Sequence, residues 1–197
     1  RQVERTGERK IVGAMGRYRI ENRLGSGAFA TVWLAVDESL DARMAIKLLA
    51  ENWMHDADVR RRFSEEARIL WRLDSDRISR VHAVDEMPDG RPYFVMDYAD
   101  GGNLADRMRD RIAAGQPYGI DEAVAISLAI ADGLAVPHAE GILPRHLKPP
   151  KLLFRRTPRG AQPVVPPDLG TPRPHTRRGS PPPHLPPAPP PPPAPDH

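Results

Sequence analysis

The prolines of this chain are concentrated at its C-terminal end, and they restrict how much of the chain can form a folded core. Of the 24 prolines, 20 lie in residues 144–197. The same segment of 54 residues contains only eight side chains of the Val, Ile, Leu, Met, Phe, Trp and Tyr types. So few large apolar side chains cannot offset the conformational entropy that is lost on ordering such a segment. We therefore expect the folded part to lie within residues 15–143.

The two segments on either side of residue 144 also differ in the sign of their net charge. Residues 1–143 carry 20 Lys and Arg against 24 Asp and Glu, whereas residues 144–197 carry nine against two. The basic excess therefore belongs to the C-terminal tail, and it does not indicate a folded domain that binds nucleic acid specifically. The absence of cysteine excludes disulfides and thiolate metal sites.

The N-terminus has no targeting signal that we can identify. Residues 1–14 are polar and charged, and we expect them to be a flexible leader before Met15. They lack the apolar core of a signal peptide, and the chain has no run of about 18 apolar residues for a membrane span. A soluble, cytoplasmic protein is the expectation.

Residues 18–49 have the pattern of three strands, with a glycine-rich loop between the first two. Residues 18–24 alternate apolar and polar side chains, and residues 25–28 interrupt the alternation with two glycines. Residues 31–36 and 44–49 are again typical of strands because they are rich in apolar, β-branched or aromatic side chains. The glycine-rich loop is therefore expected to join two strands.

The remainder of the folded part mixes helices and strands. Apolar residues recur at helical spacing from 59 to 73, and they are Val59, Phe63, Ala67, Leu70 and Trp71. Two further strands are predicted at residues 78–84 and 93–98, with a turn between them. Helices are predicted at residues 103–113 and 121–140. Asp121 is the expected N-cap of the last helix, and Pro137 predicts a kink or an early end.

The glycine-rich loop and the strands around it suit a phosphate ligand. Gly25 and Gly27 allow backbone N–H groups to approach phosphate oxygens closely, although two glycines alone also suit an ordinary turn. Val32 and Ala45 could cover a purine ring. Because side chains alternate along a strand, Lys47 lies on the same face as Ala45 and could reach the phosphates. A dinucleotide-binding reading is disfavoured, since it needs a helix directly after the loop.

Four motifs, taken in order, resemble those of bacterial, eukaryotic-like Ser/Thr protein kinases. They are LGSGAFATV at residues 24–32, MAIK at 44–47, RFSEEA at 62–67 and YFVMDYADGGNL at 93–104. The resemblance implies an α+β, protein-kinase-like fold. Its parts would be an N-lobe of antiparallel sheet and one helix (15–96), a hinge (97–102), an incomplete helical C-lobe (103–154), and a basic, Pro-rich disordered tail (155–197).

The resemblance also implies ATP and Mg²⁺ as cofactors and a protein Ser or Thr hydroxyl as phosphate acceptor. Glu66 would hold Lys47 against the phosphates, and Met96 would be the gatekeeper before the hinge. The residues implied to surround the nucleotide are Leu24, Gly25, Ser26, Gly27, Ala28, Phe29, Val32, Ala45, Lys47, Met96, Asp97 and Ala99.

The catalytic loop departs from the family pattern. The family has His-Arg-Asp-Leu-Lys-Pro-x-Asn where residues 144–151 read PRHLKPPK. Lys148 is retained, but His146 replaces the Asp that accepts the substrate proton, and Lys151 replaces a Mg²⁺-binding Asn. Asp168, in an Asp-Leu-Gly tripeptide, resembles the remaining metal ligand. We expect little or no phosphotransfer from such a site.

Three functions are compatible with these residues. The chain could be an impaired kinase, or a non-catalytic nucleotide-binding pseudokinase or scaffold whose tail offers polyproline II ligands to a partner. It could also be a non-functional kinase fragment with exposed apolar helices. Because the departures gather after residue 136, we add the hypothesis of a corrupted or frame-shifted reading. A repeat reading of the gene that returns Pro144, His146 and Lys151 would contradict it.

Overall fold

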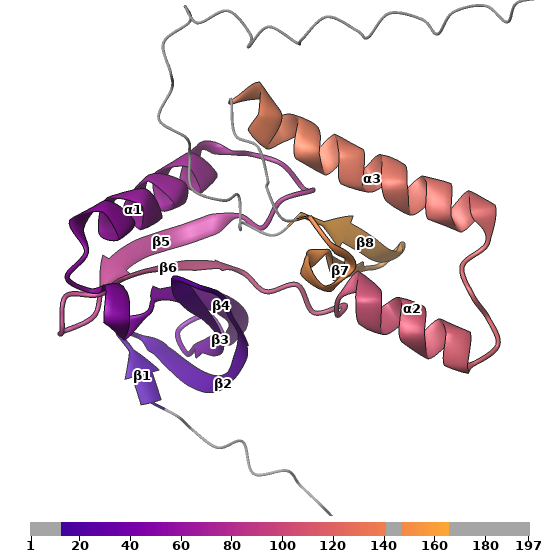
Figure 1. Cartoon of the computed structure of the whole chain (residues 1–197). Coiled ribbons are helices and arrows are strands. Elements are labelled where there is room, and N and C mark those ends of the chain that lie inside the picture. The colour runs from indigo at the N-terminus through magenta and orange to yellow at the C-terminus, as the bar shows by residue number, and fades with distance from the viewer. Residues whose placement is uncertain (1–12, 141–146, 166–197) are drawn as a thin grey trace, which may run out of the picture.

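The structure is a computed structural model that describes residues 13–140 and 147–165. Six antiparallel strands form one curled sheet in the order β1-β2-β3-β4-β6-β5 (Figure 1). The strands are β1 (Gly13–Met15), β2 (Tyr18–Ser26), β3 (Ala30–Asp37), β4 (Ala42–Leu49), β5 (Val81–Glu86) and β6 (Pro92–Asp97). All five predicted strands are present. Strand β5, at the edge of the sheet, begins three residues later than predicted.

Both faces of the sheet are covered by apolar side chains. Along β4, Ala45 and Leu49 belong to a core cluster that includes the helix residues Phe63 and Leu70. The alternate residues Ile46 and Leu48 belong to a second cluster, with Met15, Tyr18, Ile20, Ala35, Tyr93 and Val95. This alternation follows from the pleat of the strand, and it leaves the side chain of Lys47 on the face that carries the first cluster.

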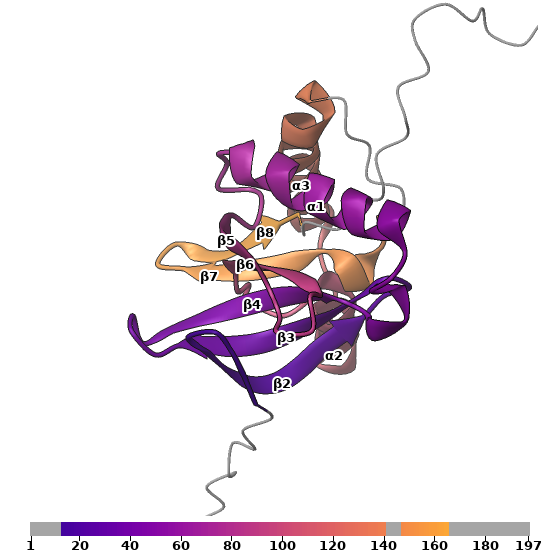
Figure 2. The same ribbon diagram turned by 90° about the vertical axis from the view of Figure 1, so that its left-hand side faces the viewer.

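Helix α1 (Ala57–Arg72) crosses the sheet, and its N-terminus is capped by Asp56, which accepts a hydrogen bond of 2.9 Å from the Val59 N–H. Figure 2, viewed from the side of the sheet, shows α1 across the sheet with α2 and α3 behind. The helix buries Phe63, Ala67 and Leu70 as expected. Trp71 was predicted to share this apolar face, but it is 57% exposed.

The chain then continues into α2 (Leu104–Ala113) and α3 (Ile120–Ala139). The N-cap of α3 is Gly119 and not Asp121 as predicted; the Gly119 N–H donates to Glu122 Oε2 at 3.1 Å. The helix continues for two residues past Pro137. Much of its apolar surface faces solvent, including Ile120, Val124 and Leu128.

A β-hairpin of β7 (Leu153–Thr157) and β8 (Gly160–Val164) follows a short 3₁₀ helix, η2 (Pro149–Lys151). It corrects our expectation that the folded domain ends at residue 154 and that a disordered tail begins at 155. The hairpin lies between α2 and α3 in Figure 1. It joins distant segments, because the Gly101 N–H donates to the Phe154 carbonyl at 2.7 Å and the Val165 N–H donates to the Arg77 carbonyl at 2.7 Å.

Several predictions fall on other parts of the chain. The predicted leader, residues 1–14, is corrected at its end, because residues 13 and 14 belong to β1 and pair with β2. Residues 1–12, the segment 141–146 and the tail from 166 onward lie outside the described residues. Among the helices that the structure describes, none combines the length and the apolar character that a membrane crossing requires.

Candidate functional site

A cavity of about 630 Å³ opens between the sheet and the C-terminal part of the molecule. Its size is within the usual range for a small-molecule site. All twelve residues that we expected around a nucleotide line this one cavity. Further lining residues were not predicted from the sequence as nucleotide contacts, and they are Ala30, Val59, Arg62, Phe63, Ser79, Tyr98, Gly102, Asn103, Pro150, Lys151 and Leu153.

An ion pair between Lys47 on β4 and Glu66 on α1 lies at the cavity. Lys47 Nζ is 2.7 Å from Glu66 Oε1, and the two side chains are only 12% and 11% exposed. The strand register places Val32 opposite Lys47 and Ala45 opposite Met96. The ammonium group is therefore held on the same face of the sheet as the apolar residues that line the cavity.

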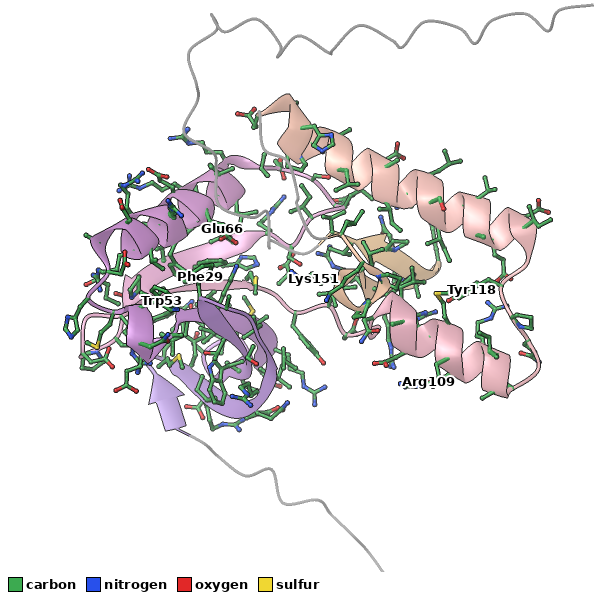
Figure 3. The ribbon with its side chains drawn as sticks, in the orientation of Figure 1. Phe29, Trp53, Glu66, Arg109, Tyr118 and Lys151 are labelled. Atoms are coloured by element: carbon green, nitrogen blue, oxygen red, sulfur yellow. The ribbon has the colours of Figure 1, made fainter. Side chains whose placement is uncertain are left out.

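The loop between β2 and β3 is tied down by residues outside the predicted motif. Trp53 Nε1 donates to the Ala28 carbonyl at 2.9 Å, and the rings of Phe29 and Trp53 are 5.1 Å apart (Figure 3). The Ala50 N–H donates to the Phe29 carbonyl at 2.9 Å. Trp53 was missed in the sequence because it lies in a short 3₁₀ helix, η1 (Glu51–Trp53), with no motif of its own.

The tip of this loop has the features of an anion-binding turn. The Gly27 N–H is used within the loop, where it donates to the Ala30 carbonyl at 2.8 Å. The N–H groups of Ala28 and Phe29 donate to no acceptor in the described part of the chain. A Cβ atom at Gly25 would meet nothing within 4 Å, so packing does not require glycine there. The absence of a side chain instead leaves room for a ligand over the loop.

Asp97, the last residue of β6, is held by residues from both parts of the molecule that the following segment connects. Its carboxylate lies 2.6 Å from His82 Nε2 on β5 and accepts a hydrogen bond of 2.9 Å from Arg155 on β7. Its N–H donates to the Arg80 carbonyl. The backbone N–H and C=O of Ala99 have no hydrogen-bond partner among the described residues, so they are free for a heterocyclic ring.

The charges around the cavity favour a polyanion. Three cationic residues line it, namely Lys47, Arg62 and Lys151. Asp97 is the only acidic lining residue in the described part of the chain, and its carboxylate is bound by His82 and Arg155. Concave surfaces lined by charge of one sign attract ligands of the opposite sign.

Of the other predicted catalytic and metal residues, the structure describes only Lys148. Lys148 is exposed and does not line the cavity. His146 and Asp168 lie outside the described residues, so their roles stay predictions. Within residues 13–140 and 147–165, no group of three or more His, Cys, Asp or Glu side chains could hold a metal ion. Among the described residues, Asp97 is the only carboxylate that lines the cavity, and His82 and Arg155 already bind it, so this part of the chain offers Mg²⁺ no free carboxylate there.

The comparison with known families agrees with this geometry. Residues 18–164 match the family described as the protein kinase domain. The chain belongs to the protein kinase domain family. The matched span extends past residue 154 and includes the β7–β8 hairpin, and the α+β fold class expected from the motifs is confirmed.

The similar proteins are bacterial kinases. The chain is 35% identical to the serine/threonine-protein kinase PknJ of Mycobacterium tuberculosis over 158 residues, which are 79% of this chain and 26% of PknJ. It is 35% identical to the serine/threonine-protein kinase PrkC of Bacillus subtilis over 139 residues, which are 71% of this chain and 21% of PrkC. The chain thus spans about a quarter of the length of these curated relatives.

A solved structure shows the same fold. The crystal structure of the PknI kinase domain of Mycobacterium tuberculosis superposes with a TM-score of 0.63 at 27% identity. The alignment covers 80% of this chain and 61% of the PknI kinase domain.

Proposed function

We propose that this chain binds ATP in the cavity between the glycine-rich loop and the segment after β6. The observation that carries the proposal is the Lys47–Glu66 ion pair, since it fixes an ammonium group at a cavity that also presents loop N–H groups. The purine would lie between the apolar side chains of Val32 and Ala45 and the backbone of Ala99. The phosphates would lie toward Lys47 and the tip of the loop.

Each group has a distinct task in this arrangement. The N–H groups of Ala28 and Phe29 point to no protein acceptor among the described residues, so they can donate to phosphate oxygens. Trp53 holds the loop through the Ala28 carbonyl and thus limits its movement. Glu66 does not line the cavity, and it acts on the ligand by holding Lys47.

A titration calorimetry experiment with ATP tests the binding proposal. The wild-type chain should bind ATP, and Lys47→Met should weaken binding by about tenfold or more, because a hydrogen bond between charged groups contributes about 1.5–3 kcal/mol. Arg61→Gln is a matched control, since Arg61 lies on the exposed side of α1 and does not line the cavity. No detectable binding by the wild-type chain at millimolar ATP would refute the proposal.

We further propose that the family reaction, transfer of the ATP γ-phosphoryl group to a protein Ser or Thr hydroxyl, is strongly impaired in this chain. When bound, ATP supplies the phosphoryl group, and the acceptor hydroxyl must lose its proton as the new P–O bond forms. His146 stands where the family has the Asp that accepts this proton. The Asp side chain is an anion, whereas an imidazole is either neutral or a cation, so it cannot supply the same negative charge at this place. Binding without transfer would make the chain a nucleotide-binding pseudokinase.

Radiolabelled ATP with a Ser- and Thr-rich acceptor protein tests the impairment. The wild-type chain should transfer little label, and the double variant His146→Asp/Lys151→Asn should transfer more. Label transfer by the wild-type chain at a rate of about 1 per second or above, typical of active kinases, and abolished by Lys47→Met would show that the site is not impaired.

A further inference from the structure

The structure places Lys151 at the same cavity as Lys47 and the glycine-rich loop. Lys151 is half-buried at the end of η2, where its N–H donates to the Lys148 carbonyl at 2.8 Å. Figure 3 shows it between the strands of the N-lobe and the β7–β8 hairpin. The backbone of this segment is further fixed by the Leu104 N–H, which donates to the Leu152 carbonyl at 2.8 Å. These bonds hold the backbone of Lys151 at the wall of the cavity, which its side chain lines.

A cation at the position of Lys151 favours an anionic ligand, where the neutral amide of the family motif favours a metal ion. The catalytic-loop motif of the family has, in the place of Lys151, a neutral amide that binds Mg²⁺, whereas an ammonium group donates hydrogen bonds and repels a metal ion. Lys151 shares the cavity with Arg62 and with Lys47, whose charge is partly offset by Glu66 at 2.7 Å. The single acidic lining residue among those described, Asp97, is already bound by His82 and Arg155. This charge balance suits phosphate oxygens and disfavours a divalent cation.

We propose that Lys151 binds the phosphates of ATP directly in the place of a metal ion, so that this site binds ATP without Mg²⁺. The inference rests on the proposed function, because it concerns the phosphates of the same ligand. Free ATP carries more negative charge than Mg²⁺-bound ATP, and three cationic side chains attract the more highly charged form more strongly. Chelation of Mg²⁺ should therefore leave binding intact or strengthen it.

Titration calorimetry with ATP in two buffers of equal ionic strength, one with Mg²⁺ and one with EDTA, tests the proposal. Equal ionic strength matters because salt screens these interactions. The wild-type chain should bind ATP at least as tightly in EDTA as in Mg²⁺. In EDTA, Lys151→Asn should weaken ATP binding by about tenfold, and Lys151→Arg should retain most of it.

Two controls separate the phosphate contact from other effects. Arg109→Gln removes a positive charge from the exposed side of α2, away from the labelled residues of the cavity (Figure 3), and it should leave ATP binding in EDTA unchanged. Adenosine lacks the phosphates, so its affinity should be the same for the wild-type chain and Lys151→Asn. Circular dichroism shows whether each variant is folded.

The outcomes distinguish this inference from the proposed function. If the wild-type chain binds ATP in neither buffer, both are refuted. If it binds ATP in Mg²⁺ and loses binding in EDTA, the proposed function stands and the role of Lys151 is refuted. Equal affinities of the wild-type chain and Lys151→Asn for ATP in EDTA would also refute that role, whether or not Lys151→Arg binds.

Discussion

The ion pair between Lys47 and Glu66 should contribute to stability as a shielded pair and not as a surface pair. The two side chains come from different elements, β4 and α1, and each is about nine-tenths covered. Lys47→Met or Glu66→Gln removes one charge and leaves the other without its partner at 2.7 Å. We expect either substitution to lower the free energy of unfolding.

The expected loss in the free energy of unfolding lies between the values for a fully buried pair and for an exposed pair. Removing one partner from a fully buried pair costs about 3–5 kcal/mol, whereas an exposed pair contributes about 0–1 kcal/mol. Both groups of this pair are mostly shielded, but Lys47 lines an open cavity. We therefore expect each single substitution to cost about 2 kcal/mol, and the coupling energy from a double-mutant cycle to be about 1.5–2 kcal/mol.

Urea unfolding of the wild-type chain, the two single variants and the double variant gives this coupling energy. The matched control is the pair of Arg61 and Glu65 on the same helix, which is 3.0 Å apart but 58% and 38% exposed. Its coupling should be several-fold smaller because water screens both groups. A Lys47–Glu66 coupling below about 0.5 kcal/mol, or one equal to that of the control pair, would refute the reasoning.

Three further predictions concern packing, pH and the loop. Gly101→Ala would place a Cβ atom 2.6 Å from the Phe154 carbonyl oxygen, and urea unfolding should show a loss of about 1–3 kcal/mol. The pKa of Asp37 lies below its ordinary value because Ser39 donates hydrogen bonds to its carboxylate. The ionised carboxylate therefore stabilises the fold above about pH 4. The difference in stability between the wild-type chain and Asp37→Asn, measured by thermal unfolding, should shrink as pH falls below that value. Gly25→Val should change the unfolding free energy by less than about 1 kcal/mol, since a Cβ there meets no atom within 4 Å, but it should weaken ATP binding in calorimetry.

The features that could be predicted from the sequence are those with a local signal. Alternation of apolar and polar side chains predicted β2, because the pleat of a strand imposes that period. The β-branched and aromatic side chains of residues 31–36 predicted β3 on the other side of the glycine-rich loop. Helical spacing predicted α1, and Trp71 was misplaced because it follows Leu70 directly and so lies about a hundred degrees around the helix. The pairing of Lys47 with Glu66 was expected from the family motifs.

The β7–β8 hairpin could not be predicted because its stability comes from distant residues. Its backbone pairs with residues 101–102 and with residue 77, and it packs against Gly133 of α3, where a Cβ would lie 2.7 Å from Val165. None of these contacts leaves a periodic pattern in residues 153–165 themselves. The high proline content of the surrounding segment also indicated disorder, although a two-stranded hairpin tolerates Pro163.

On the functions that we propose, the two substitutions in the catalytic loop would act on different steps, one on chemistry and one on binding. Phosphotransfer needs an acceptor for the substrate proton, and His146 replaces that acceptor. Binding of ATP needs only shape and positive charge, and Lys151 adds charge to a cavity that already holds Lys47. A change that would disable a metal-dependent kinase would, on this proposal, preserve or strengthen the attraction for the nucleotide. The charge placed at the cavity, more than the identity of the lost ligand, determines what the site can still bind.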